Sequence, residues 1–227
     1  MSLTSDQAAR HAVQLRVPGM TEGQERLAAA RVRVVGAGGL AGPALIALAQ
    51  AGVGRLWIDD PEAVNEADER GWLLAPGTSG APRADVAVAR LQETTRMTRA
   101  EQYPIGGVPT ATLICAPTPG ERLVAAEQAR RAGVPHVVLE PDADGGSVVS
   151  IPPGAPCYAC ARSTGPSGRE AQAGAAALSL LAALELLLAI AYPGASGGRR
   201  IELVRGLPLS RPTARLAGCS CGAGSTP

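Results

Sequence analysis

The residues best suited to chemistry in this chain are a glycine turn and an acidic side chain that follows it. The turn covers residues 36–41, GAGGLA, and fits the pattern G-x-G-x-x-A. Gly36, Gly38 and Gly39 allow a sharp turn and a close approach of the backbone to a phosphate, and the free N–H groups of a following helix attract the anion. Asp59 comes 21 residues after Gly38. We expect its carboxylate to bind ribose hydroxyls.

The elements that must position these residues form a β–α–β unit. A β-branched run at residues 32–35 predicts a buried strand, and the apolar stretch Leu40–Ala51 predicts a helix. A second strand is predicted at Arg55–Ile58, directly before Asp59. Because strand, turn, helix, strand and acid follow in this order, the pattern favours a nucleotide site over an α/β turn without a ligand.

Four cysteines near the end of the chain form two close pairs. Cys157 and Cys160 lie in APCYACAR, and Cys219 and Cys221 lie in AGCSCGAG. Two such pairs joined by a long insert predict a structural zinc site that fastens the tail to the body of the protein. The alternatives are reduced structural thiols or a disulfide. Cys115, at the end of a predicted buried strand, is expected to be a small core residue.

Composition and charge exclude several classes of function. The chain has 227 residues and a formal net charge of +1, which argues against a nucleic-acid partner held by bulk electrostatics. Every basic residue is an arginine, so a Schiff base, a P-loop lysine and a lysine general base are excluded. The first ten residues, MSLTSDQAAR, have no apolar signal core, and we therefore expect a cytoplasmic protein.

Strands and helices alternate along the rest of the chain. This order predicts an α/β fold, Rossmann-like, with a mainly parallel sheet flanked by helices and a C-terminal strand region. Further helices are predicted at Glu22–Ala30, near Glu66–Leu74, at Ala84–Thr95 and at Gly120–Ala132, and further strands at Thr110–Cys115, Pro135–Leu139, Ser147–Ile151, Arg199–Arg205 and Pro208–Leu216.

The stretch Ala171–Tyr192 is the most apolar in the chain. Its length would just span a bilayer. Glu185 lies near its middle, however, and a carboxylate there costs roughly 2.5–3.5 kcal/mol on insertion scales. We therefore predict a buried helix that packs on the sheet or against a second subunit, with no membrane partner.

Several segments together resemble the ThiF/MoeB/HesA family, the bacterial relatives of ubiquitin-activating enzymes. They are GQERL at residues 23–27, ARVRVVGAGGLAGPAL at residues 30–45, AGVGRLWIDD at residues 51–60, Arg70, PCYAC at residues 156–160, and the last cysteine pair before Gly222. The resemblance covers nearly the whole chain. It implies a single ThiF-type nucleotide-binding domain over residues 1–227, with a helical arm (1–30), a Rossmann-like core (31–151) and a zinc-stapled part (152–227).

The resemblance also implies an activity. Members of the family bind ATP and Mg2+ and adenylate the C-terminal carboxylate of a small ubiquitin-like or sulfur-carrier protein or peptide, with release of pyrophosphate. They usually form homodimers and carry a structural zinc ion. In this chain the three glycines of the turn would shape the phosphate site and Asp59 would hold the ribose. Arg70 matches an arginine that contacts the phosphates, and Arg83 stands where the family has a lysine.

Several positions depart from the family pattern. Arg83 keeps the positive charge of the lysine but has a planar fork in place of an ammonium group. Thr118 stands near the family's magnesium-binding aspartate, Ala67 near an asparagine, and Val13 where an N-terminal arginine reaches the partner subunit. Glu140, Asp142 and Asp144 follow the next strand and are candidate replacements for the aspartate, although a solvated turn is the simpler interpretation of these three acids.

Three functions remain open from the sequence. The first is an active ATP-dependent adenylyltransferase, which the glycine turn, Asp59 and Arg70 favour. The second is a degenerate member that serves as a non-catalytic binding partner in a biosynthetic complex. The third, an NAD- or FAD-dependent oxidoreductase, is disfavoured by the cysteine pairs and by the spacing of Asp59 and Arg70. His11 and His136 have no visible partner and receive no role.

Overall fold

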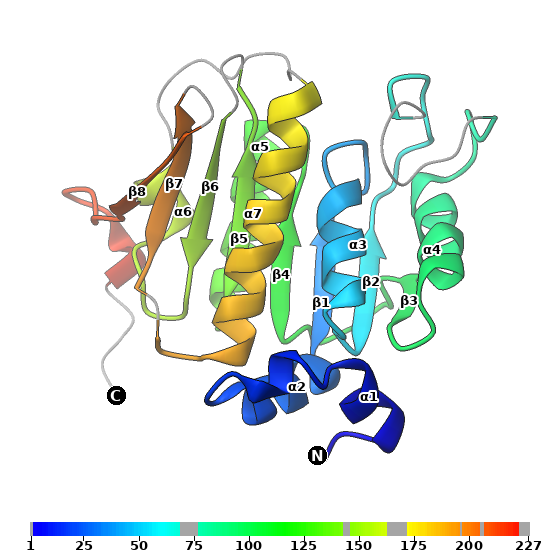
Figure 1. The fold of residues 1–227 in the computed structure, drawn as a ribbon. Helices are drawn as coiled ribbons and strands as arrows, with labels where there is room; N and C mark the ends of the chain where they lie inside the picture. Colours follow the sequence, from blue (N-terminus) through cyan, green and yellow to red (C-terminus); the bar gives the residue numbers. More distant parts are fainter. Residues whose placement is uncertain are drawn as a thin grey trace.

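The computed structural model describes residues 2–68, 77–142, 146–162, 172–195, 197–204 and 207–222. Its centre is a sheet in the strand order β3-β2-β1-β4-β5-β6-β7-β8 (Figure 1). The strands are β1 (Arg31–Val35), β2 (Arg55–Asp59), β3 (Arg99–Gln102), β4 (Ala111–Ile114), β5 (His136–Glu140), β6 (Gly146–Ile151), β7 (Arg199–Val204) and β8 (Leu207–Pro212). The helices are α1 (Ser5–Arg10), η1 (Gln14–Arg16), α2 (Met20–Ala29), α3 (Gly42–Gln50), α4 (Arg83–Thr94), α5 (Pro119–Arg131), α6 (Tyr158–Ala161), α7 (Gln172–Ala191) and η3 (Ser220–Gly222).

The sheet has a parallel half and an antiparallel half. Strands β3, β2, β1, β4 and β5 run parallel to their neighbours, whereas β6, β7 and β8 are antiparallel. The predicted Rossmann-like α/β fold is therefore confirmed. The sequence did not predict β3, whose residues are RAEQ. Only Ala100 of this edge strand is fully buried, so its sequence carries almost no hydrophobic pattern.

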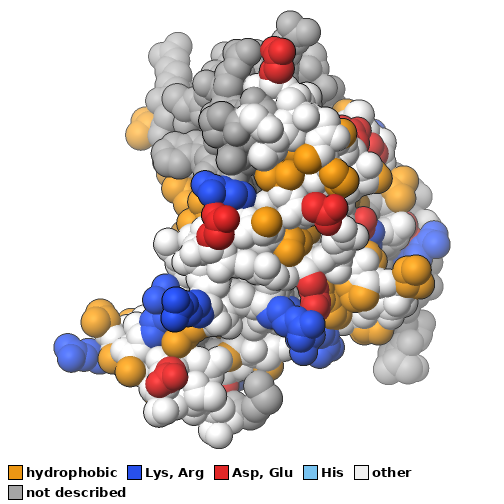
Figure 2. All heavy atoms as spheres, turned by 90° about the vertical axis from the view of Figure 1, so that its right-hand side faces the viewer, with side chains coloured by type: hydrophobic (Ala, Val, Ile, Leu, Met, Phe, Trp, Pro, Cys, Tyr) orange, Lys and Arg blue, Asp and Glu red, His pale blue; other side chains and the backbone are white. Residues whose placement is uncertain are grey.

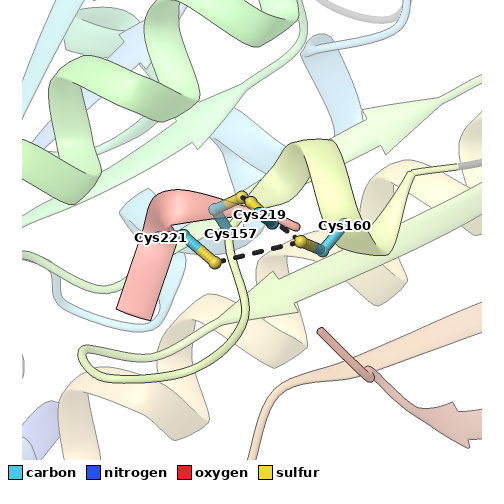
Figure 3. A group of neighbouring side chains, drawn as sticks. All are labelled: Cys157, Cys160, Cys219 and Cys221. Carbon is cyan, nitrogen blue, oxygen red and sulfur yellow. Dashed lines mark hydrogen bonds between the residues drawn. The ribbon is translucent and has the colours of Figure 1, made fainter. Parts of the chain in front are cut away.

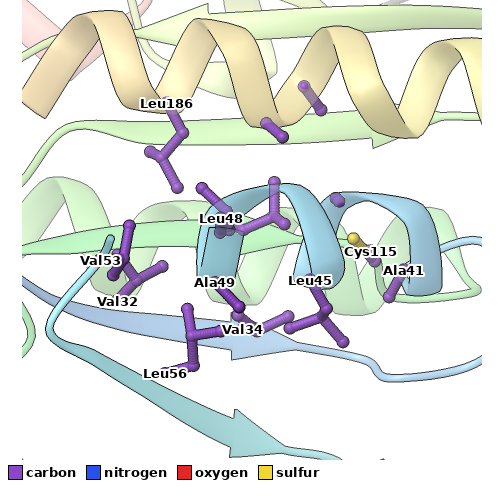
Figure 4. Close-up of a cluster of buried hydrophobic side chains, with 14 of the residues drawn as sticks. Val32, Val34, Ala41, Leu45, Leu48, Ala49, Val53, Leu56, Cys115 and Leu186 are labelled. Atoms are coloured by element: carbon purple, nitrogen blue, oxygen red, sulfur yellow. The ribbon is translucent and has the colours of Figure 1, made fainter. Parts of the chain in front are cut away.

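The first strand and the helix after it form the centre of the core. Val32 and Val34 are fully buried and belong to one cluster with Leu45 and Leu48 of α3 (Figure 4). Helix α3 begins at Gly42, slightly later than predicted, because Pro43 fits the first turn of a helix and the turn before it is irregular. Cys115 is buried in the same cluster, as predicted for a core residue.

Helix α7 is buried on the sheet, as predicted. Leu178 and Leu186 are fully buried, and the helix packs on β4, β5 and β6 and against α2 and α3. The Glu185 carboxylate accepts two hydrogen bonds from Arg199 of β7, at 2.8 and 2.7 Å. In the described part of the chain, no helix is long and apolar enough to cross a membrane. Glu185, the residue that makes a bilayer span unfavourable, therefore has an arginine partner inside the fold.

The two faces of the sheet are covered unequally. Helices α3, α4 and α7 lie on the face turned toward the viewer in Figure 1. On the other face, α5 packs on β4 and β5, and α6 packs on α5 and β6. The connection from β3 to β4, residues 103–110, contains no helix. Among the residues that the structure describes, the half of this second face over β1, β2 and β3 is therefore crossed only by a short irregular segment.

Candidate functional site

The glycine turn lies at the end of β1 and is tightly packed. Gly36 has a φ of +86°, and a Cβ atom there would lie 2.9 Å from the carbonyl oxygen of Cys115. Any other residue at this position would combine an unfavourable backbone conformation with a steric clash. The Gly36 N–H donates to the backbone carbonyl oxygen of Asp59 at 3.0 Å. The turn is thus fixed between the ends of β2 and β4.

A cavity of about 570 Å³ lies beside this turn. Gly36, Asp59 and Arg83 line it, together with Asp60 and, from α5, Gln128. Its walls come from the carboxyl ends of β1, β2 and β4 and from the start of α5, which is where open α/β sheets bind their ligands. The volume is within the range of small-molecule sites. The structure therefore brings three of the sequence-predicted residues into one cavity.

Arg83 is buried at the start of α4 and is held by acids. Its guanidinium group lies 3.1 Å from Asp60 and 2.8 Å from Asp68, and the exposed Glu62 is 3.3 Å away. Burial by itself would lower the pKa of Arg83, but its hydrogen bonds and ion pairs with Asp60 and Asp68 raise it above the ordinary value. Arg83 is therefore a fixed positive charge beside the glycine turn.

Carboxylates also accept hydrogen bonds from the N–H groups of the turn. Asp60 accepts a hydrogen bond from the Ala37 N–H at 2.7 Å, and Asp68 accepts one from the Gly39 N–H at 3.3 Å. These are donors that a bound phosphate would use. Neither aspartate was predicted as a site residue, although the acidic composition of residues 59–68 was the available signal. In this structure the chain's own acids cap the anion site.

Asp59 lines the cavity but is engaged by a different arginine. Arg33 of β1 donates from Nε to the Asp59 carboxylate at 2.8 Å and from Nη1 to the side-chain amide oxygen Oε1 of Gln128 at 2.8 Å. The same guanidinium group lies 4.6 Å from the centre of the Tyr103 ring. A contact of Asp59 with ribose stays a prediction, and the carboxylates that reach the turn belong to Asp60 and Asp68.

Two other predicted positions have different outcomes. Arg70 lies outside the described residues, so its role stays a prediction. Thr118 is the N-cap of α5. Its side chain accepts from the Glu121 N–H at 3.2 Å, and the Glu121 side chain accepts from the Thr118 N–H at 3.0 Å. This reciprocal pair is a capping box, so Thr118 has a local role in starting the helix.

Glu140 is not part of a solvated turn, and that interpretation is wrong for this residue. It is buried at the end of β5, where it accepts hydrogen bonds from Ser147 at 2.8 Å and Tyr158 at 2.6 Å. Arg200 of β7 forms an ion pair with it at 2.5 Å. Burial and the neighbouring Glu140 charge raise the pKa of the Tyr158 hydroxyl. Asp144 lies outside the described residues.

The four cysteines form a cluster between α6 and the tail (Figure 3). The Sγ atom of Cys157 lies 3.7 Å from those of Cys160 and Cys219, and Cys160 lies 3.9 Å from Cys221. Tetrahedral zinc with Zn–S bonds of about 2.3 Å requires sulfur atoms about 3.8 Å apart. A disulfide needs a separation of about 2.05 Å, so that alternative does not fit. Among the described residues, this is the one place where at least three His, Cys, Asp or Glu side chains come close enough together to hold a metal ion between them.

The fold and site define a Rossmann-like α/β protein with a cavity at its glycine turn and a four-cysteine cluster near its end. Residues 10–106 match the model of the ThiF family. This match places residues 10–106 of the chain in the ThiF family.

Its curated relatives are adenylyltransferases. The chain is 40% identical over 107 residues to a sulfur carrier protein adenylyltransferase of Thermus thermophilus, covering 46% of this chain and 40% of that protein. It is 33% identical over 169 residues to the adenylyltransferase and sulfurtransferase uba4 of Neosartorya fischeri, covering 70% of this chain and 35% of that protein. The chain thus spans well under half the length of these two relatives.

Solved structures share the fold. The crystal structure of Escherichia coli MccB with ATP has a TM-score of 0.75 and 16% sequence identity, and covers 97% of this chain and 75% of the MccB chain. The structure of MccB, the microcin C7 biosynthetic enzyme, in complex with N-formylated MccA has a TM-score of 0.73 at 15% identity, covering 97% and 77%. At this level of identity the similarity concerns the fold alone.

Proposed function

We propose that this chain is an ATP-dependent adenylyltransferase that activates the C-terminal carboxylate of a small ubiquitin-like or sulfur-carrier protein or peptide. The observation that carries the proposal is the cavity that joins the glycine turn, Arg83 and Asp59 at the carboxyl ends of β1 and β2. The activities named for the relatives from Thermus thermophilus and Neosartorya fischeri support it.

The reaction joins two anions, and the cavity supplies opposing charge. A carboxylate oxygen attacks the α-phosphorus of ATP, a new C–O–P linkage forms, and the bond to the β-phosphate breaks with release of pyrophosphate. The N–H groups of the turn, Arg83 and the family-matched Arg70 would neutralise the developing charge. Asp60 and Glu62 line the cavity and offer the hard oxygen ligands that Mg2+ prefers. Bound Mg2+ would shield the phosphate charges.

We also propose a structural zinc ion at Cys157, Cys160, Cys219 and Cys221 and assembly as a homodimer. The sulfur separations support the zinc ion. The family resemblance supports the dimer, as do two leucines of α7, Leu180 and Leu184, which are about half exposed.

Calorimetry with ATP, with and without Mg2+, tests the proposal. We expect Mg2+-dependent binding of ATP and none of NAD. Arg83→Gln should weaken ATP binding by at least tenfold, because it removes the buried cation of the cavity. Arg90→Gln, an exposed change on the same helix, is the matched control and should bind like the wild type. Failure of folded, zinc-loaded protein to bind ATP would contradict the proposal.

A second candidate is a non-catalytic binding partner that retains the fold. It is favoured by the occupation of the Ala37 and Gly39 N–H groups by Asp60 and Asp68. The two candidates separate on pyrophosphate exchange with a cognate carrier. The adenylyltransferase exchanges labelled pyrophosphate into ATP only when the carrier and Mg2+ are present, whereas a binding partner captures the carrier without exchange.

A further inference from the structure

The segment between β3 and β4, residues 103–110, crosses an open face of the sheet. Because the two strands are parallel members of one sheet, the segment must run from the carboxyl edge back to the opposite edge. The Tyr103 hydroxyl donates to the carbonyl oxygen of Gly107 at 2.7 Å, and Arg31 Nε donates to that of Val108 at 3.1 Å. Ile105 is fully exposed and Val108 is largely exposed. Aliphatic side chains are thus presented to solvent on this face.

Three arginines lie in a row beside this segment. Arg31 pairs with Arg55, and Arg55 with Arg99, in the register of β1, β2 and β3, so the three side chains share one face. The Arg55 side chain is 46% exposed and that of Arg99 67%. Figure 2 views the β3 edge and shows basic side chains in the lower half of the molecule, next to hydrophobic ones.

The arginine row carries more positive than negative charge. Glu101 lies 3.3 Å from Arg55 and 3.0 Å from Arg99, and it also accepts a hydrogen bond from Trp57 Nε1 at 2.8 Å. Arg31 has no ion pair with any described carboxylate. Two of the three guanidinium groups therefore share one glutamate, and the third contacts the carbonyl oxygen of Val108.

We propose that the arginine row (Arg31, Arg55 and Arg99), with Ile105 and Val108, is a docking surface for an acidic polypeptide segment that also carries aliphatic side chains. Carboxylates of the partner complement the arginines, and its aliphatic groups pack on Ile105 and Val108. The row lies where β1, β2 and β3 begin, at the edge opposite the glycine turn. The proposal therefore does not depend on adenylation.

The surface favours a polypeptide over a nucleic acid for two reasons. Trp57 is only 6% exposed and Tyr103 packs against it edge-on, with ring centres 6.0 Å apart, so the Trp57 ring offers no open face for base stacking. Glu101 also lies within the row, where it would repel phosphates. The chain's net charge of +1 supplies no general attraction for a polyanion.

Fluorescence anisotropy with a labelled peptide of alternating Glu-Glu-Leu triplets tests the proposal on the full chain. We expect binding that weakens as salt is raised, because the contacts are charge pairs at the surface. Arg55→Gln combined with Arg99→Gln should weaken binding at least fivefold. The control is Arg90→Gln combined with Arg131→Gln, which removes the same charge from exposed positions on α4 and α5 and should leave binding unchanged.

Circular dichroism and thermal unfolding establish that both double variants are folded. Ile105→Ser is a third variant, which leaves every arginine in place. It should weaken binding of the same peptide by about threefold and leave the salt dependence of binding unchanged. The proposal is overturned if the peptide does not bind, if the two double variants lose affinity for the peptide equally, or if a twelve-nucleotide single-stranded DNA binds in place of the peptide. The proposal is also overturned if the arginine row serves only self-association. In that case the variant with Arg55→Gln and Arg99→Gln would show a concentration-dependent loss of oligomer mass, and the peptide would not bind.

Discussion

At the scale of single residues, buried charges in this chain are matched by specific partners. Arg83 is fixed by Asp60 and Asp68, and Arg33 by Asp59. A buried unpaired charge would cost several kcal/mol, so these pairs also restrict where the side chains can point. The same pairing places two carboxylates on the donors of the glycine turn. Phosphate binding must therefore compete with acids that belong to the protein.

Asp68→Asn tests this competition. Asparagine keeps the size of the side chain and an acceptor for the Gly39 N–H, but it removes one negative charge from the phosphate site. We expect ATP to bind roughly tenfold more tightly, about 1.4 kcal/mol, as measured by calorimetry at fixed ionic strength. Asp85→Asn, an exposed change on α4, is the control. Weaker ATP binding by the Asp68→Asn protein would show that this carboxylate assists the nucleotide instead.

At the scale of elements, α7 and β7 are joined by a charge pair between Glu185 and Arg199. Glu185 is buried and Arg199 is partly exposed, so the arginine neutralises a charge that the core cannot solvate. The hydrogen bonds with Glu185, partly offset by burial, raise the pKa of Arg199. The pair lets a carboxylate lie within an otherwise apolar helix.

Arg199→Ala should destabilise the fold more than an ordinary surface change does. It leaves the buried Glu185 carboxylate without a partner, and we expect a loss of about 3–5 kcal/mol in the free energy of unfolding, measured with urea. Combining it with Glu185→Leu should recover most of the loss, because the buried charge is then absent. Arg211→Ala on β8 is the control, with a cost below about 0.5 kcal/mol. A similar loss in the control would argue against a specific pair.

The short helix α6 and the tail depend on the four cysteines. Cys157 and Cys160 belong to the α6 turn, and Cys219 and Cys221 lie at η3, with few other contacts to fasten this end of the chain. Tyr158, between the first two cysteines, bonds to Glu140 and so connects the cluster to β5. Metal binding at this site would add its binding free energy to the stability of the tail.

Cys160→Ser should remove the zinc ion. By inductively coupled plasma mass spectrometry we expect about one zinc ion per chain in the wild type and close to none in the variant, because structural zinc sites use four ligands. The thermal midpoint of unfolding should fall as well. Cys115→Ser is the matched control, since this core cysteine lies outside the cluster, and it should keep its zinc. Equal zinc content in the two variants would argue against the proposed ligand set.

At the scale of the whole molecule, the sheet divides the surface into separate regions. The cavity lies at the carboxyl ends of β1, β2 and β4, whereas the arginine row lies where β1, β2 and β3 begin. The cysteine cluster joins α6, which packs on α5 and β6, to the tail at η3 (Figure 3). The proposed adenylation site and the proposed docking surface are therefore far enough apart in the fold to be occupied at the same time.

The sequence by itself determined the features that depend on neighbours along the chain. The glycine turn, the strands β1 and β2, the apolar helix α7 and the spacing of the cysteine pairs all follow from local patterns. Arg83 and Asp59 line the cavity beside the turn, and their roles in binding stay predictions. Only the tertiary structure decided that Asp60 and Asp68 reach the turn, that Arg199 faces Glu185, and that Glu140 is buried with Arg200. Each of these contacts joins groups brought together by the packing of separate strands, helices and loops. A carboxylate has the same local signature whether it faces water or a buried arginine, and only the fold supplies the difference.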